Sequence, residues 1–320
     1  MTRQPGSTDG PSIGVVVVTH AARRHLERCL PPLLRSPLRP RVLVVNSSSG
    51  DGTVELAEAM GAETFVVPRA SFNHGLTREL ARRRLGTAVV AMLTPDAYPV
   101  RDDFLERLTA PVRDGHAAVA YGRQIPREDA APVERLGRIF NYPATSHVRS
   151  LTDWPQHGGY THFCSNACAA WSNAALDAIG GFKATLVSEE TIAAAELLAR
   201  GHKIAYVAEA VVVHSHAQSL EDAFRRQFDI GYTRRLHADL LLARERDEVR
   251  GRQFATMALR KAAVAELPRV VAHLAVSWLG YRIGMAGPRL PQAVARRLSG
   301  QDYYWTSEPA RNGARGLAVA

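Results

Sequence analysis

The 320-residue sequence has few cysteines and no long apolar segment. Cys29, Cys164 and Cys168 are too few and too scattered to form a disulfide framework, which is typical of a protein of the reducing cytoplasm. No run of about eighteen apolar residues occurs, so the sequence predicts no clean membrane span. Residues 1–12 are polar and lack the apolar core of a secretory signal, and we expect them to be flexible.

Two common phosphate-binding loops are also missing. The first predicted strand, residues 13–19, is followed by His20-Ala21-Ala22 and not by the G-x-G-x-x-G of a dinucleotide-binding Rossmann fold. A Walker A loop is absent as well, which argues against a P-loop NTPase. If the protein binds phosphates, side chains or a cation must hold them.

Acidic residues are scarce in the last quarter of the chain. The formal net charge is +9, and residues 250–320 carry eleven Lys and Arg against three Asp and Glu. This local excess favours an anionic surface as a partner, although a solvated basic face explains it equally well. The sequence has no helix-turn-helix or RNP pattern, so we expect no nucleic-acid partner.

Short, β-rich apolar segments alternate with helical patterns over the first hundred residues. The predicted strands are residues 13–19, 41–45, 64–67 and 88–93. This alternation predicts an α/β fold with a mostly parallel sheet and helices on both faces. Pro31 and Pro32 are expected to kink or break the first helix.

Asp96 follows the fourth predicted strand directly. Pro95 cannot extend a strand ladder, so the strand must end before it. Side chains beyond the carboxyl ends of strands are where open α/β sheets bind ligands. The position therefore marks Asp96 as a ligand-binding residue, with a plain turn or helix cap as the alternative.

A series of short motifs follows the predicted strand ends in a fixed order. The series consists of Thr19, residues 45–53 (VNSSSGDGT), 72–78 (FNHGLTR), 93–97 (LTPDA), 121–124 (YGRQ), 140–143 (FNYP), 163–166 (FCSN), 188–191 (SEET), 214–216 (HSH), 279–282 (LGYR) and 304–305 (YW). In this order the motifs resemble the inverting glycosyltransferases of family 2, above all their rhamnosyltransferase branch. The resemblance covers about residues 13–305.

The resemblance implies a Rossmann-like GT-A fold with a C-terminal helical extension. Residues 13–218 would form the catalytic domain, with a nucleotide-sugar half at about 13–125 and an acceptor half at about 126–218. A helical, basic region would follow over 219–305, and a disordered tail over 306–320.

The resemblance also implies an enzyme that moves a sugar, such as rhamnose, from dTDP-rhamnose or a UDP-sugar. The acceptor would be a hydroxyl of a glycan or a lipid-linked molecule, and the transfer would invert the anomeric centre. Glycosylation of a small molecule stays open, and so does a homologue that binds nucleotide sugars without catalysis.

A divalent cation, Mg²⁺ or Mn²⁺, is expected between Asp96 and the donor diphosphate. The family usually has a second acid nearby, but here Thr94 and Ala97 flank Asp96, so one carboxylate remains. His214 and His216 follow an apolar run, and alternation places both on one strand face. Either histidine could complete the metal site or contact a phosphate, and a purely structural pair is the alternative.

Glu190 is the candidate general base, with Glu189 beside it. Ser188 can cap the helix that begins there, and the helix dipole would favour ionised carboxylates in its first turn. The family pattern is Glu-Asp, with the second acid as the base, so the choice between the two glutamates stays open. Two acids that only complement the dipole are the alternative.

The remaining candidates would contact the donor and the acceptor. Arg78 has a fork of donors suited to a diphosphate, and Asn166 and Trp171 could meet the acceptor, with core packing as the alternative for the tryptophan. The predicted nucleotide-sugar contacts are Thr19, His20, Asn46, Ser48, Asn73, His74, Arg78, Thr94 and Asp96.

The C-terminal quarter predicts helices over 224–242 and 254–281, broken at Pro268. Val271, Trp278 and their apolar neighbours, with Arg269 and Arg282 at the edges, fit an interfacial amphipathic helix. We expect a cytoplasmic protein that attaches peripherally to the anionic inner membrane leaflet. The alternative is that these apolar faces pack on the catalytic domain.

Overall fold

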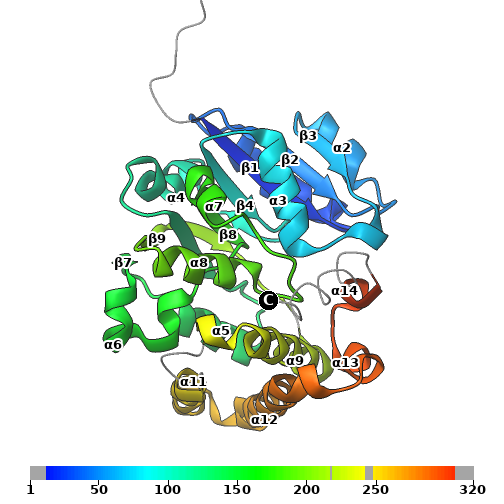
Figure 1. Cartoon of the computed structure of the whole chain (residues 1–320), viewed down its shortest axis with the longest axis vertical. Coiled ribbons are helices and arrows are strands. Elements are labelled where there is room, and N and C mark those ends of the chain that lie inside the picture. The colour runs from blue at the N-terminus through cyan, green and yellow to red at the C-terminus, as the bar shows by residue number, and fades with distance from the viewer. Residues whose placement is uncertain (1–11, 217, 242–247, 307–320) are drawn as a thin grey trace, which may run out of the picture.

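One sheet runs through the first two thirds of the chain, and helices cover both of its faces (Figure 1). The computed structural model describes residues 12–216, 218–241 and 248–306. The predicted flexible N-terminus and the predicted disordered tail lie almost wholly outside these residues. The strands are β1 Ile13–Thr19, β2 Arg41–Asn46, β3 Glu63–Val66, β4 Val89–Leu93, β5 Tyr98–Pro99, β6 Val119–Ile125, β7 His147–Arg149, β8 Cys168–Ser172 and β9 Ile204–Val213.

The sheet has the order β3-β2-β1-β4-β8-β6-β9-β5, and β7 pairs with β9. Strands β3, β2, β1 and β4 are parallel, which confirms the predicted mostly parallel α/β sheet. The sequence pattern did not predict that β8 inserts antiparallel between β4 and β6. Because β8 opposes both neighbours, β4, β6 and β9 still run in one direction, and their carboxyl ends lie at one edge of the sheet.

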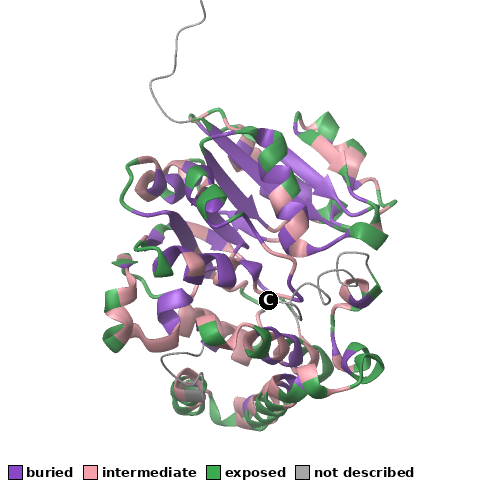
Figure 2. Ribbon diagram, in the orientation of Figure 1, coloured by how far each residue is buried: buried purple, intermediate pink, exposed green. Residues whose placement is uncertain are grey.

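The helices of the sheet region pack on it in two groups. Apolar side chains of α1, α2 and α4 form one buried cluster with the sheet, and those of α3, α7 and α8 form a second. Figure 2 shows the strands as the most buried part of the molecule. These helices are α1 Arg23–Leu34, α2 Thr53–Ala59, α3 His74–Leu85, α4 Phe104–Arg113, α5 Pro132–Asn141, α6 Trp154–His157, α7 Asn173–Ala178 and α8 Glu189–Ala199.

The expected break at Pro31 and Pro32 is wrong. Helix α1 continues through both prolines to Leu34. Each proline removes one amide donor, so the carbonyls of Glu27 and Arg28 lose their intrahelical partners. The helix has less than one turn left to form, however, and the carbonyl of Pro31 still accepts from the amide of Arg35.

The C-terminal region is helical, as predicted, and lies against the carboxyl-end edge of the sheet (Figure 1). Helices α9 and α12 approach closely because glycines line their contact: a side chain at Gly280 or Gly284 would collide with the carbonyl oxygens of Phe224 and Phe228. No helix among the described residues is long and apolar enough to cross a membrane. These helices are α9 Leu220–Leu236, α10 Ala238–Leu241, α11 Glu248–Lys261, α12 Leu267–Ala286, α13 Gln292–Leu298 and α14 Asp302–Thr306.

Candidate active site

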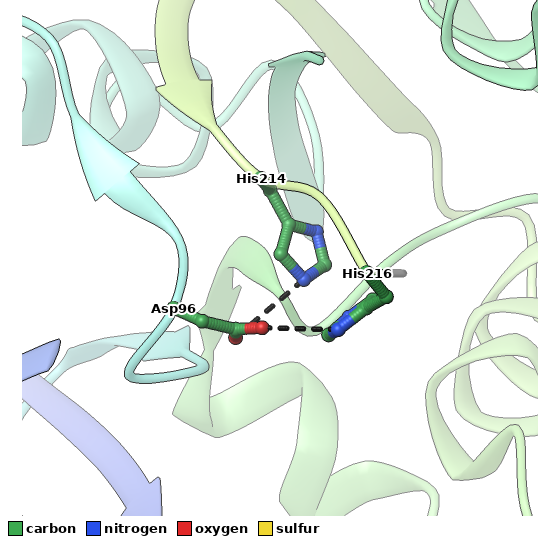
Figure 3. A group of neighbouring side chains, drawn as sticks. All are labelled: Asp96, His214 and His216. Atoms are coloured by element: carbon green, nitrogen blue, oxygen red, sulfur yellow. Dashed lines mark ion pairs between the residues drawn. The ribbon is translucent and has the colours of Figure 1, made fainter. Parts of the chain in front are cut away.

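Asp96, His214 and His216 come together at the carboxyl-end edge of the sheet (Figure 3). Asp96 lies in the turn after β4, and the two histidines follow β9. Asp96 Oδ1 is 3.5 Å from His214 Nε2, and Asp96 Oδ2 is 3.1 Å from His216 Nδ1. One ligand atom from each of the three residues lies within 4.8 Å of the others. The sequence prediction that these residues share a site is consistent with this geometry.

The protonation states of this cluster suit a cation. Burial alone would raise the pKa of Asp96, but its contacts with His214 and His216 outweigh that effect and keep it low. Burial lowers the pKa of His214, and burial together with His214 lowers the pKa of His216 to about 4. The carboxylate is therefore ionised and both imidazoles are neutral near pH 7. Buried Nε2 of His214 has no hydrogen-bond partner, so its lone pair is available to a metal ion.

The other ring nitrogen of His214 contacts Gln124 at the end of β6. His214 Nδ1 and Gln124 Oε1 are 2.8 Å apart, and both side chains are buried. Gln124 Oε1 also accepts a hydrogen bond from Arg138 of α5, and Gln124 Nε2 donates to Ser165 Oγ at 2.9 Å. Neither Gln124 nor Arg138 was predicted to have a role. Gln124 is the last residue of the YGRQ motif at 121–124, which was the sequence feature that could have drawn attention to it.

Glu189, the first residue of α8, is buried among donors. Arg78 of α3 forms an ion pair with Glu189 Oε1, and Asn166 Nδ2 donates to the same oxygen at 3.1 Å. Burial would raise the pKa of Glu189, but Arg78, His74 and Asn166 outweigh it and lower the pKa. Arg78, predicted as a diphosphate ligand, is buried and forms this ion pair, while its Nε has no hydrogen-bond partner among the described residues.

Glu190 is half-buried, and its environment differs from that of its neighbour. Burial, together with the negative charge of Glu189, raises the pKa of Glu190 to about 8. The expectation that the helix dipole keeps both carboxylates ionised is therefore not met at Glu190, where burial and the like charge outweigh the dipole. Ser188 occupies the cap position of α8 with φ +64°, but its side chain makes no capping hydrogen bond, which corrects the predicted cap.

Three of the predicted nucleotide contacts form hydrogen bonds within the loops and strand ends. Thr19 is buried and donates to the carbonyl of Val45, and buried Asn46 bonds Thr19 and Ser49. Buried Asn73 caps α3 and donates to the carbonyl of Thr185. For Thr19, Asn46 and Asn73 the predicted direct contact is not supported by this geometry, because their polar groups already have protein partners.

The other predicted nucleotide contacts differ in their exposure. His20 and Ser48 are exposed, and Thr94 is half-buried beside Asp96 with its hydroxyl unpartnered. His74 is half-buried, with its ring edge-on to Phe72 and to Tyr303 of α14. Burial lowers the pKa of His74 to about 4, so this ring is neutral.

Trp171 lies in β8 and is fully buried, with its ring edge-on to Phe182. Its Nε1 donates to Asn166 Oδ1 at 2.9 Å, and Asn166 in turn donates to Glu189. The expectation that Trp171 contacts an acceptor sugar is wrong for this conformation, because no face of the indole is exposed. Asn166 is also buried, and both ends of its amide have protein partners, so the two residues orient Glu189.

Arg226 of α9 is a further residue at the site that sequence reasoning missed. Its side chain is exposed, and it has no hydrogen bond or ion pair with any residue that the structure describes. Its charge acts on Glu190, His214 and His216, so it lies near both parts of the site. Nothing in the sequence near position 226 indicated that α9 would place Arg226 near Glu190 and the two histidines.

Comparison with known proteins identifies the family. Residues 11–233 match the protein family described as "Glycosyltransferase like family 2". The chain is a family 2 glycosyltransferase. It is 32% identical over 305 residues to the O-antigen chain rhamnosyltransferase RfbN of Salmonella typhimurium, covering 92% of this chain and 96% of RfbN. It is also 32% identical over 275 residues to the O-antigen chain rhamnosyltransferase WbaN of Salmonella anatum, covering 83% and 86%.

Solved structures confirm the GT-A fold of this glycosyltransferase. The mannosyltransferase PcManGT from Pyrobaculum calidifontis, solved with GDP-Man and Mn²⁺, aligns with a TM-score of 0.54 and 16% identity over 98% of this chain and 81% of its own. Glucosyl-3-phosphoglycerate synthase from Mycobacterium tuberculosis, solved with Mn²⁺, UDP-glucose and phosphoglyceric acid, aligns with a TM-score of 0.51 and 17% identity over 75% and 85%. The predicted family, fold and class of enzyme are therefore all confirmed.

Proposed function

We propose that this glycosyltransferase transfers rhamnose, with inversion, from dTDP-rhamnose to a hydroxyl of a glycan or a lipid-linked glycan. The likeness to two O-antigen chain rhamnosyltransferases over nearly the whole chain supports the sugar and the class of acceptor. The observation that carries the chemistry is the convergence of Asp96, His214 and His216 at one edge of the sheet, with Arg226 acting electrostatically on both histidines and on Glu190. A UDP-sugar is the alternative donor.

Asp96, His214 and His216 would hold a divalent cation. Two imidazoles and one carboxylate suit Mn²⁺ better than Mg²⁺, which prefers oxygen ligands. When bound, the ion would neutralise charge on the donor diphosphate as it leaves. Arg226, exposed and without a protein partner among the described residues, is placed to contact the same phosphates.

Glu190 would accept the proton of the acceptor hydroxyl. A base with a pKa of about 8 is a stronger proton acceptor than an ordinary glutamate and is still partly ionised near neutral pH. Glu189 is less suited to this task, because Arg78 and Asn166 both contact its Oε1 and lower its pKa. We therefore assign the base to Glu190 and a supporting role to Glu189.

The test is a transfer assay with dTDP-rhamnose, UDP-glucose and a glycan acceptor, in Mn²⁺ and in EDTA. We expect nucleoside diphosphate release that needs acceptor and is highest with dTDP-rhamnose and Mn²⁺. NMR of the product should show the anomeric configuration opposite to that of the donor. Tight donor binding with no release in the presence of several acceptors would instead support a non-catalytic homologue, and transfer to small aglycones alone would support natural-product glycosylation.

We also propose that the outward face of α12 contacts an anionic membrane surface, such as the inner membrane leaflet. The inward face of this helix, with Val270, Gly280 and Gly284, is buried against other helices. The outward face leaves large apolar side chains exposed: Val271 at 52%, Trp278 at 62% and Leu279 at 46%.

The charge around this face suits anionic lipid. Residues 250–306 contain nine Arg and Lys against Glu266 and Asp302. Glu266 is held in an ion pair with Arg135 of α5, which reduces its repulsion of anionic headgroups. An exposed apolar stripe bordered by basic side chains is the pattern of an interfacial helix.

Flotation of the full chain with liposomes tests the membrane contact. We expect binding to vesicles with phosphatidylglycerol, weak binding to neutral vesicles, and loss of both in V271D/W278D. The matched control is V148D, because Val148 is 50% exposed on β7, away from α12 (Figure 1). Absence of wild-type flotation, or equal flotation of both variants, would contradict the proposal.

A further inference from the structure

Gln124 lies at a point where two parallel strands end together. Strands β6 and β9 pair in parallel, with Gln124 opposite Val212, and the amide of His214 donates to the carbonyl of Ile125 at 3.0 Å. The backbone therefore fixes the positions of Gln124 and His214 relative to each other. A carboxamide beside an imidazole can either accept a hydrogen bond from its N–H or donate one to its bare nitrogen, and the side chains around the pair decide which.

Arg138 decides the orientation of the amide. A guanidinium can only donate hydrogen bonds, so the group that it contacts on Gln124 must be the oxygen. Ser165, 2.9 Å from the amide nitrogen, accepts the bond on the other side. A flipped amide would place its nitrogen against Arg138, with two donors facing each other. The buried Gln124 side chain consequently has one favourable orientation.

The orientation of Gln124 then determines the tautomer of His214. Because Gln124 Oε1 faces His214 Nδ1 at 2.8 Å and can only accept, the imidazole proton must lie on Nδ1. Nε2 then carries a lone pair. This nitrogen is buried, has no hydrogen-bond partner, and lies 3.5 Å from Asp96 Oδ1. The opposite tautomer would place a proton where a metal ion must bind.

We propose that Arg138 and Gln124 are positioning residues that hold His214 in the tautomer able to ligate a divalent cation through Nε2. The proposal rests on the metal site proposed above and adds what keeps Nε2 of His214 free of a proton and able to bind the cation. Partners beyond the ligands that fix a histidine tautomer typically change metal affinity by about 10- to 100-fold when removed.

Mn²⁺ binding by the full chain, followed by electron paramagnetic resonance without donor or acceptor, tests this role separately from activity. Q124M should weaken Mn²⁺ binding about 10- to 100-fold, whereas Q124E, which still accepts from both neighbours, should stay within about threefold. R138M should weaken binding about three- to tenfold, since the amide can then flip. R135M is the matched control on the same helix, because Arg135 pairs with Glu266 and not with Gln124.

The double variant Q124E/R138M separates this role from any direct effect of the Arg138 charge. A carboxylate has two equivalent acceptor oxygens and cannot be flipped into a donor, so removing Arg138 in the Q124E background should leave Mn²⁺ affinity unchanged. Long-range ¹H–¹⁵N spectra of the histidine rings at mildly alkaline pH should show His214 with Nδ1–H in the wild type and a tautomer mixture in R138M.

Three outcomes would overturn the proposal. These are wild-type Mn²⁺ affinity in Q124M, an equal loss from R138M in both backgrounds, or an unchanged tautomer in R138M. D96N distinguishes this failure from failure of the metal site itself: D96N should abolish Mn²⁺ binding, and if it does not, the ion binds elsewhere.

Thermal unfolding of each variant shows whether it is folded. S165A removes the acceptor on the far side of the amide and is a milder variant, for which we expect a smaller loss of Mn²⁺ affinity.

Discussion

Asp96 and Glu189 are both carboxylates that contact two nitrogen-bearing side chains, but their partners differ in kind. The partners of Asp96 are His214 and His216, which are neutral and carry lone pairs. The partners of Glu189 are Arg78 and Asn166, whose facing groups can only donate. Asp96 and its two histidines can therefore ligate a cation, whereas the N–H groups around Glu189 offer a cation no lone pair. The chemistry of the partners decides what each acid can do.

The same principle separates Glu189 from Glu190, which are adjacent in sequence. Glu189 takes the buried ion pair and remains charged, and that charge together with burial raises the pKa of Glu190 to about 8. The glutamate without the ion pair is thus the one that can change protonation state during a reaction cycle. Variants at four positions test these contrasts, from the largest expected effect to the smallest.

Replacing Asp96 with asparagine should have the largest effect. D96N keeps the size of the side chain but removes the charge that the two histidines and a cation share, so turnover should fall by about 10³-fold. Steady-state kinetics in Mn²⁺ measure the loss. D102N is the control, because Asp102 is an exposed acid paired with Arg35 outside the site. Wild-type turnover in D96N would mean that the diphosphate departs elsewhere.

Replacing Glu190 with glutamine should lower kcat by at least about 10²-fold while nucleotide affinity stays nearly constant. The amide cannot accept the hydroxyl proton, but it leaves the donor-binding residues in place. Calorimetric titration of the nucleotide, beside kcat from donor consumption, separates the two effects. The control is E128Q, because Glu128 is exposed. A normal kcat in E190Q, or an equal loss of kcat in E128Q, would argue against Glu190 as the base.

Replacing Glu189 with glutamine should change the pH profile. In the wild type, kcat/KM should rise with pH up to about 8, because Glu190 must lose its proton to act as the base. Removing the charge of Glu189 lowers the pKa of Glu190, so in E189Q the acidic limb should move to lower pH. An acidic limb that stays in place would show that Glu189 does not act on the base.

The same variant has a consequence for stability. E189Q leaves buried Arg78 without its counter-charge, which should lower the free energy of unfolding by about 3 kcal/mol in urea titrations. In the wild type, Glu190 binds its proton more tightly when folded, so its contribution falls as pH rises from its ordinary value of 4.5 towards about 8. The dependence of the free energy of unfolding on pH between about 4.5 and 8 should therefore be weaker in E189Q than in the wild type.

The sequence predicted residues whose positions follow from strand ends, and it failed where long-range packing decides. Asp96 could be recognised from its place after a predicted parallel strand, and the family resemblance joined His214 to it. The partner of Glu189 is Arg78, 111 residues away, and no local pattern shows which of two adjacent glutamates that arginine will reach. The role of Trp171 could not be predicted either. An aromatic residue in a strand can pack in a core or contact a sugar, and only the burial of Trp171 in the structure distinguishes the two.

Ser188, just before the two glutamates, should give the smallest effect. Its φ of +64° is a left-handed conformation that an L-residue adopts at about 1 kcal/mol, and its hydroxyl makes no capping bond. S188G should therefore raise the free energy of unfolding by about 0.5–1 kcal/mol. S188A should leave it within about 0.5 kcal/mol, whereas loss of a real cap would cost about 1 kcal/mol. Urea titrations measure the free energy of unfolding of both variants. If S188A alone were destabilised, the Ser188 hydroxyl would cap α8 in solution, as the sequence predicted. Should S188G gain stability while kcat falls, the strained residue before α8 is what holds Glu190 in its working position.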